Sequence, residues 1–236
     1  MGIWDRFRGR FSSRSAGPVE PAPASVVNAA AADAFGTALA EEGLEAIGLR
    51  KWGRPGARSI REVFELQALK GASYTPYWGF SFDFVPHLAG EGEVRWHRTL
   101  KSARVDLGCR PIDHETSRAR RDEWHTHRFL TRGELLADFR RLADLAIPEA
   151  VRWWSRVKGE SDLPAAFEER RSRPVVGIPF ESYVQESLAY SFMLARFGDP
   201  RAGEVLQNLA STLARPEQSR RQLEELVGGK SSLTSD

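Results

Sequence analysis

All five histidines of the 236-residue chain lie between residues 87 and 127, about a sixth of its length. Imidazole is the commonest protein ligand for metal ions, and a metal with open coordination positions can activate water for hydrolysis. Two of the histidines are two residues apart and would share one face of a strand. No spacing matches a defined signature such as H-E-x-x-H, so histidines that hydrogen-bond to carbonyls and carboxylates of the fold are the alternative. The candidate ligands of a divalent metal are His87, Glu123, His125 and His127.

Basic side chains gather between residues 50 and 61, in a segment that also contains glycine and proline. Backbone amides of a glycine-containing turn can approach a phosphate group beside such side chains. No G-x-x-x-x-G-K-[ST] motif accompanies them, and a solvated loop in an arginine-rich chain is the alternative. The candidate phosphate-binding residues are Arg50, Lys51, Arg54 and Arg58.

Aromatic residues are frequent between residues 74 and 97, where several of them flank polar positions. Such a mixture is typical of core packing and also of ligand grooves, which combine apolar walls with a few polar groups. We expect a groove lined by Tyr77, Asp83, His87, Trp96 and His97. Nucleophilic catalysis is not indicated, because the chain has no G-x-S-x-G motif and its one cysteine, Cys109, precedes no helix start that would lower its pKa.

The elements that position these residues are predicted from hydrophobic periodicity. In the segment YWGFSFDFV, residues Trp78, Phe80, Phe82 and Phe84 alternate with smaller or polar residues, which predicts a half-buried strand. A strand is also predicted at residues 60–68, and short strands at 94–98 and 103–107 would extend the sheet as an antiparallel meander. Before the sheet, residues 25–47 have the spacing of an amphipathic helix.

The second half of the chain has the pattern of helices. Thr131 and Glu134 form a capping box that opens one helix, and Pro148 would start or kink its continuation. Further helices are predicted at residues 163 onward, 180–197, 201–213 and 216–227. The fold class is therefore α+β, with an antiparallel sheet of about four or five strands packed on an N-terminal helix, followed by an all-helical second half.

Composition and segment character predict the domain organisation. Residues 1–24 read as a disordered basic and aromatic arm with a Pro/Ser/Ala linker, and residues 229–236 as a disordered tail. Residues 25–228 would form one α+β domain, with its sheet part at 48–130 and its helical part at 131–228. Residues 1–11 would place apolar side chains on one helix face, which suits weak contact with a membrane surface or a partner; a frayed turn is the alternative.

Charge and cysteine content bound the partners and the compartment. The formal net charge is only +2, so a nucleic-acid partner is not required. The sequence has no apolar run long enough for a transmembrane segment, and one cysteine fits a reducing cytoplasm. The cofactor and the partner, whether protein or small molecule, stay open at this point.

The order of these elements resembles a bacterial family catalogued as domain of unknown function 4304. The resemblance spans residues 39–154 and rests on Gly48-Leu49-Arg50-Lys51, on a strand that contains Leu66-Gln67, and on the aromatic strand that follows. The chain departs from the family in reading WGFSFDFVPH where the family has an Asn-Leu-Gly element. The resemblance implies no activity and no catalytic residues.

The sequence therefore favours a non-enzymatic module that binds a ligand or a protein through the groove residues. A metal-dependent hydrolase built on the histidines is the first alternative. A phosphate-backbone binder that uses the basic segment is the second.

Overall fold

The computed structural model describes residues 20–70, 73–88, 94–127, 129–173, 183–212 and 221–227. The helices and strands, in chain order, are α1 (Ala24–Glu41), β1 (Glu45–Gly48), β2 (Lys51–Pro55), β3 (Ile60–Leu69), β4 (Ser73–Phe82), β5 (Pro86–Leu88), β6 (Val94–Trp96), η4 (Leu100–Ser102), β7 (Leu107–Cys109), α2 (Pro111–His114), α3 (Arg118–Glu123), β8 (Thr126–His127), α4 (Arg132–Trp154), η5 (Glu160–Asp162), α5 (Leu163–Ser172), α6 (Val184–Arg196) and α7 (Arg201–Thr212). Residues 221–227 are also helical.

Six strands form an antiparallel sheet in the order β1-β2-β3-β4-β7, with β8 paired to the start of β4. The central strands β3 and β4 pair over their whole lengths, from Ile60 opposite Phe82 to Leu69 opposite Ser73. β5 and β6 form a separate two-stranded antiparallel sheet. The predicted α+β fold is confirmed, and the sheet has one strand more than the upper number expected.

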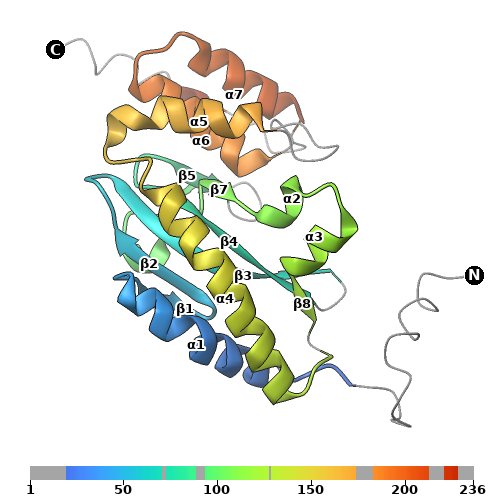
Figure 1. Ribbon diagram of the computed structural model, residues 1–236. Coiled ribbons are helices and arrows are strands. Elements are labelled where there is room, and N and C mark those ends of the chain that lie inside the picture. Colours follow the sequence, from blue (N-terminus) through green and yellow to red (C-terminus); the bar gives the residue numbers. More distant parts are fainter. Residues whose placement is uncertain are drawn as a thin grey trace, which may run out of the picture.

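One face of the sheet carries the aromatic wall that the period-two pattern predicts. Trp78, Phe80 and Phe82 on β4 are buried on this face, and Trp78 stacks on Phe64 of β3 with ring centroids 6.2 Å apart. α1 and α4 lie side by side across this face (Figure 1). Phe35 of α1 lies 5.4 Å from Phe64 between ring centroids. Burial of a large aromatic side chain stabilises the fold by roughly 2 kcal/mol, so this layer holds the two helices on the sheet.

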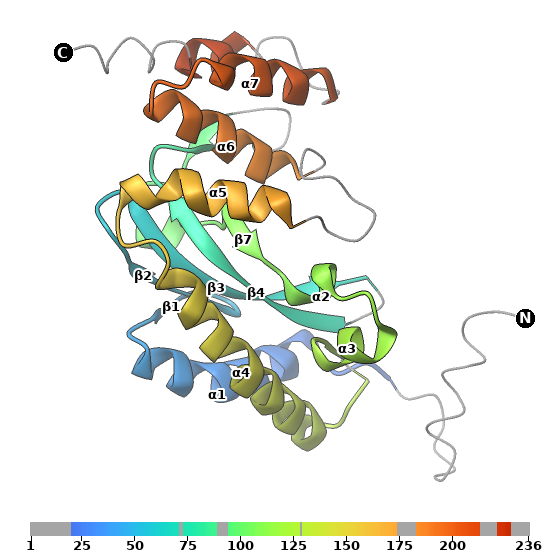
Figure 2. The ribbon, with the colours of Figure 1, turned by 45° about the horizontal axis from the view of Figure 1, so that its top comes forward.

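The helices of the second half form a layer at one end of the sheet, where α5, α6 and α7 follow one another (Figures 1 and 2). The capping box that opens α4 is confirmed: the Thr131 backbone N–H donates to Glu134 Oε2 at 2.9 Å, and Glu134 N–H donates to Thr131 Oγ1 at 3.4 Å. α4 includes Pro148 and runs on to Trp154 as one helix.

The first helix is shorter than predicted, because α1 ends at Glu41 and residues 45–48 form β1. Gly43 has a φ of 78°, and Leu44 N–H donates to the Leu39 carbonyl at 2.9 Å. This six-to-one hydrogen bond after a left-handed glycine is the Schellman ending of a helix. The apolar spacing that continues to Ile47 therefore belongs to a strand.

The predicted meander after β4 is wrong in its connections. β6 pairs with β5 in the small sheet, whereas Leu107–Cys109, rather than residues 103–107, forms the strand β7 that lies next to β4. The polar stretch after residue 110 contains the short helices α2 and α3, and the Ser117 hydroxyl caps α3 by accepting from Arg120 N–H at 3.2 Å.

Among the described residues, none of the helices combines the length and the apolar character needed to cross a bilayer. The predicted N-terminal arm lies outside the described residues up to residue 19, as does the predicted tail at 229–236.

Candidate functional site

The second face of the sheet is turned away from the aromatic wall and carries polar side chains. Arg61 of β3 lies opposite Ser81 of β4, and both alternate along their strands with the buried aromatics of the first face. Lys51 of β2 lies on the same face, since its partner across the strand pair is Glu65. Arg61 is only 8% exposed and Ser81 is fully buried, so this face is covered as well.

Residues 97–106 cover this face, and two glycines make room for them. A Cβ at Gly53 would lie 3.1 Å from Leu100 Cδ1, and a Cβ at Gly79 would lie 2.7 Å from Val105 Cγ1. The second distance is shorter than real Cβ contacts, so a side chain at Gly79 would push the covering segment away. Glycine is needed here for close approach of the chain.

Arg61 and His97 meet beneath this segment. Arg61 Nη2 donates to the His97 carbonyl oxygen at 2.5 Å. Arg61 Nε and His97 Nε2 are both buried and have no hydrogen-bond partner in the part of the chain that the structure describes. Burial lowers the pKa of Arg61, an effect that the charges of Asp83 and Asp106 oppose. Arg61 forms no ion pair within the described residues, so these two carboxylates act on it only at a distance.

Asp106 is a buried carboxylate whose two oxygens both accept hydrogen bonds. Phe82 N–H donates to Oδ2 at 2.7 Å, and Gln185 Nε2 of α6 donates to Oδ1 at 2.7 Å. Burial raises the pKa of Asp106 to about 7, although both hydrogen bonds and the charge of Arg61 act to lower it. The carboxyl group therefore titrates near neutral pH.

Gln185 also determines the hydrogen-bonding state of His87. Gln185 Nε2 donates to Asp106 and, at 3.2 Å, to the Pro86 carbonyl. The other amide atom of Gln185, Oε1, therefore accepts from His87 Nδ1, which lies 3.2 Å away. Arg104 Nη1 lies 2.8 Å from His87 Nε2, and a guanidinium can only donate. His87 is therefore the neutral Nδ1–H tautomer, with its Nε2 lone pair directed at Arg104.

The neighbouring groups that act on His97 all lower its pKa, and the charged ones among them are cations. Its pKa is lowered to about 4, first by burial and then by Arg104, His87, Lys51 and Arg61. Lys51 Nζ donates to the Ala103 carbonyl of the covering segment, and burial lowers its pKa too. We call this group the cationic cluster; its members are Lys51, Arg61, His87, His97 and Arg104, with Asp106 and Gln185 as polar partners.

Of the expected groove residues, the structure brings His87 and His97 together, with ring centroids 5.3 Å apart. Asp83 lies in the turn after β4, where its N–H donates to the Ser59 carbonyl at 3.1 Å and its charge acts on Arg61. These three residues belong to or adjoin the cationic cluster.

The other two expected groove residues lie apart from it. The Trp96 ring meets Phe192 of α6 edge-on at 6.4 Å and packs against the core. Tyr77 lies further along the second face, with its hydroxyl 2.6 Å from where a Cβ of Gly108 would be. Burial raises the pKa of Tyr77 well above its ordinary value.

The candidate metal ligands fall into two places. His125 and His127 have ring centroids 5.0 Å apart, and Thr126 between them pairs with Tyr74 at the start of β4. His87 follows the other end of β4. The nine residues from Tyr74 to Phe82 span roughly 26 Å of extended strand, so His87 cannot join the other two histidines in one site.

The side chains around His125 and His127 are engaged with the protein itself. His125 Nδ1 lies 2.7 Å from the Arg121 carbonyl, and His125 Nε2 lies 3.8 Å from Asp122 Oδ1. At Glu123 the backbone carbonyl accepts from Arg141 Nη1 at 2.5 Å. Over the described ranges, no group of three or more His, Cys, Asp or Glu side chains has an arrangement that could hold a metal ion.

Two of the candidate phosphate residues serve the fold. The Arg50 guanidinium lies over the Tyr74 ring, 4.9 Å from its centroid. Arg54 Nε pairs with Glu62 Oε2 at 2.5 Å, and the guanidinium lies 5.5 Å from the centroid of the Trp154 ring. Arg54 also donates to the Glu42 carbonyl, so it ties β2 to the end of α1.

The other two candidates, Lys51 and Arg58, do not join Arg50 and Arg54 in one place. Lys51 enters the cationic cluster on the second face, whereas Arg54 faces the opposite side of β2. Arg58 lies in the turn between β2 and β3 with a φ of 27°. The structure therefore does not gather these four residues into one site.

Sequence reasoning included Arg61 in the basic segment but did not select Arg104 of the cluster or its polar partners Asp106 and Gln185. Asp106 carries a signal that could have been used, because a carboxylate between Val105 and Leu107 interrupts an apolar run and so indicates a buried polar group. Gln185 carries none, since it lies 98 residues from its partner His87.

A second buried polar set completes the edge of the sheet. Arg170 of α5 and Glu186 of α6 pair at 2.9 Å, with side chains only 5% and 6% exposed. Glu186 Oε1 accepts from Gly108 N–H at 3.3 Å, and Arg170 Nε donates to the Gly108 carbonyl at 3.1 Å. The pair thus binds the N–H and the carbonyl of Gly108, at the edge of β7, as a neighbouring strand would. Burial raises the pKa of Glu186 to about 7.

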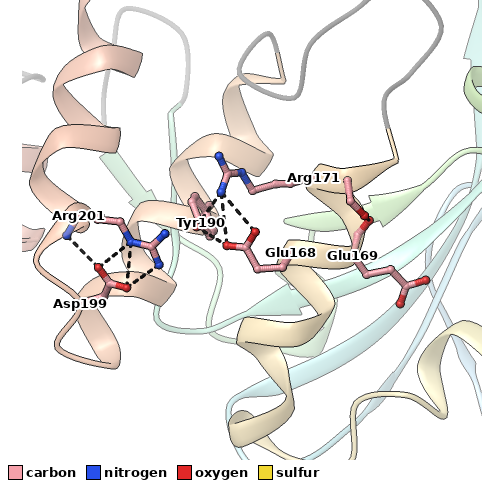
Figure 3. Close-up of polar contacts among 7 residues, drawn as sticks. Glu168, Glu169, Arg171, Tyr190, Asp199 and Arg201 are labelled. Carbon is pink, nitrogen blue, oxygen red and sulfur yellow. Dashed lines mark hydrogen bonds and ion pairs between the residues drawn. The ribbon is translucent and has the colours of Figure 1, made fainter.

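Polar contacts also join the helices of the second half at the surface (Figure 3). The Tyr190 hydroxyl donates to Glu168 Oε1 at 2.6 Å and accepts from Arg171 Nη1 at 2.9 Å. Asp199 and Arg201, at the start of α7, pair at 2.7 Å. These contacts connect α5 to α6 and fix the turn before α7.

No family model, no curated protein and no solved structure matches this chain. The resemblance of residues 39–154 to domain of unknown function 4304 stays a prediction.

Proposed function

We propose that this protein is a non-enzymatic binding module and that its ligand is a small molecule held at the cationic cluster. The observation that carries the proposal is the state of Arg61. The residue is only 8% exposed, forms no ion pair within the described residues, and leaves Nε without a hydrogen-bond partner. Buried charges in proteins are normally paired, and more than about 90% of buried polar groups have a partner. A ligand that accepts from Arg61 supplies the missing partner.

His97 supports the same proposal. Its Nε2 is also buried without a partner among the described residues, and its backbone carbonyl is bound to Arg61. Arg61 and His97 are in contact through that carbonyl, so one ligand that reaches both residues would partner both nitrogens. Each unpaired buried group costs about 1–3 kcal/mol, which ligand binding would recover in part.

A binding role is favoured over catalysis because two titratable groups of the site, Asp106 and His87, are engaged by the protein. Asp106 accepts on both carboxylate oxygens, and His87 uses both ring nitrogens. A general base needs a lone pair within hydrogen-bonding reach of the proton that it removes. In this arrangement both nitrogens of His87 are in hydrogen bonds, and each oxygen of Asp106 already accepts one hydrogen bond from the protein.

Histidine ring NMR tests the proposal, because His87 and His97 lie together at the cluster and His125 and His127 lie together elsewhere. We would assign the ring signals with single His→Gln variants and titrate the protein with anionic, neutral and cationic small molecules. We expect one class to shift the signals of His87 and His97 and to leave those of His125 and His127 unchanged. Failure of every class to shift the His87 and His97 signals would refute the proposed function.

We also propose a cytoplasmic location in a bacterial cell. The support is that the chain has one cysteine, Cys109, which fits a reducing compartment. Fractionation of the host cell with an antibody against the protein tests this location.

A further inference from the structure

The charge around His97 selects the class of ligand. Besides burial, the four groups that shift its pKa most are Arg104, His87, Lys51 and Arg61, and each of them lowers it. A carboxylate close to the ring would raise its pKa instead. The imidazole edge that carries the unpartnered Nε2 therefore lies in a positive potential, which favours an anion.

Within the described residues, no carboxylate forms an ion pair with Arg61 or Lys51. Asp83 and Asp106 act on Arg61, and Glu65 and Asp106 act on Lys51, but among the described residues none of the three forms an ion pair with either cation. Asp106 is already bound on both oxygens. The described part of the cluster is therefore short of acceptors for its donors.

We infer that the cationic cluster binds a small tetrahedral oxyanion, either free phosphate or sulfate or the terminal phosphoryl group of a small phosphomonoester, through Arg61, His97 and Arg104. This inference rests on the proposed function and names its ligand class. A tetrahedral oxyanion offers several acceptor oxygens, which match the fork of a guanidinium and one imidazole N–H together.

The exposure of the cationic side chains gives the direction of approach. Arg104 is exposed, His97 and Lys51 are half-buried, and Arg61 is buried. Arg104 is therefore the solvent side of the proposed site, and Arg61 is its inner side. Gln185 keeps Arg104 near the site indirectly, because it holds His87 in the tautomer whose Nε2 accepts from Arg104.

Isothermal titration calorimetry with inorganic phosphate, sulfate and glycerol phosphate tests the inference, with chloride held constant. The informative variant is Arg104→Glu, which places a carboxylate beside the anion site on an exposed residue; circular dichroism checks that the variant is folded. The matched control is Lys101→Glu, which makes the same change of charge on an exposed residue of the same covering segment. We expect Arg104→Glu to weaken binding about tenfold or more, and Lys101→Glu to weaken it less than about threefold.

The pKa of His97 gives a second readout that does not depend on affinity. A bound oxyanion favours the protonated ring, so saturating phosphate should raise the pKa of His97 from about 4, whereas chloride at equal ionic strength should not. The ring signals of the wild-type protein, followed over pH, measure this change. Tighter binding of glycerol phosphate than of phosphate would assign the site to a phosphomonoester, and the reverse order would assign it to the free anion.

The inference and the proposed function fail in different ways. A neutral or cationic compound that shifts the His87 and His97 signals, while phosphate, sulfate and glycerol phosphate leave them unchanged, would overturn the oxyanion and keep the binding module. Equal weakening by Arg104→Glu and Lys101→Glu would also overturn it, because binding would then reflect net charge alone. No shift with any compound would overturn both.

Discussion

The buried pair of Arg170 and Glu186 allows a sharp test of how the helical half is held on the sheet. Arg170→Met removes the ion pair at 2.9 Å and the hydrogen bond from Nε to the Gly108 carbonyl at 3.1 Å. It leaves a carboxylate that is 6% exposed without its cation. Removal of one partner of a buried ion pair costs about 3–5 kcal/mol, and we expect a loss of unfolding free energy in that range.

The neighbouring arginine is the matched control. Arg171 lies on the same helix and pairs with Glu168, but its side chain is 32% exposed and that of Glu168 is 54% exposed. Exposed pairs contribute about 0–1 kcal/mol, and the contact of Arg171 with the Tyr190 ring adds a similar amount. Arg171→Met should therefore cost about 1 kcal/mol, measured for both variants by urea unfolding at neutral pH.

The pH dependence of the Arg170→Met variant follows from the acid that is left behind. Arg170 lowers the pKa of Glu186, so without it the folded-state pKa rises further above that of the unfolded chain. An acid whose folded-state pKa is raised stabilises the fold most below its unfolded pKa and loses that contribution as the pH rises through the folded value. The deficit of the variant should therefore shrink as the pH is lowered from the alkaline side to about 7, and change little below it.

A double variant separates charge from packing. Arg170→Met with Glu186→Gln removes the uncompensated charge and keeps an acceptor for Gly108 N–H. It should be more stable than Arg170→Met alone at neutral pH. The reasoning is refuted if Arg170→Met costs no more than Arg171→Met, or if its deficit does not change with pH.

Three further predictions concern the sheet, the cluster and a helix end. Gly79→Ala should prevent folding or cost several kcal/mol, because its Cβ would lie 2.1 Å from the Leu107 carbonyl oxygen. In the control Gly36→Ala, the Cβ meets nothing within 4 Å. This control should be more stable by about 0.5–1 kcal/mol in thermal unfolding, because alanine favours the α1 helix. Because burial raises the pKa of Asp106 from 3.8 to about 7, its contribution to stability is complete below about pH 4 and is lost as the pH rises through 7. Asp106→Asn should reduce the slope of stability against pH between about 4 and 8, and an unchanged slope would contradict this assignment. Thr131→Ala should cost about 1 kcal/mol through loss of the α4 cap, and an unchanged melting temperature would show that the capping box does not contribute.

Local patterns in the sequence determined the type of the strongest elements. The alternation of Trp78, Phe80 and Phe82 predicted a strand with one aromatic face, and Thr131 with Glu134 predicted the start of α4. Both signals depend on residues within a few positions of one another, where backbone geometry sets the period. Apolar spacing predicted the wrong end for α1, because this spacing continues past Gly43 into β1. The end of the helix is marked by Gly43 alone, which has a left-handed backbone conformation.

The assembly of the candidate site was decided by the tertiary structure. The histidines that the sequence suggested as one cluster are separated along β4. Thr126, between His125 and His127, pairs at one end of that strand, and His87 follows the other end. Arg61 meets His97 across 36 residues, and Gln185 meets His87 across 98. These contacts arise because Gly53 and Gly79 let residues 97–106 lie on the sheet and because α6 docks at the edge of β7. Sequence periodicity tells which face of an element is polar, but only the packing of elements that are distant in sequence brings those faces together.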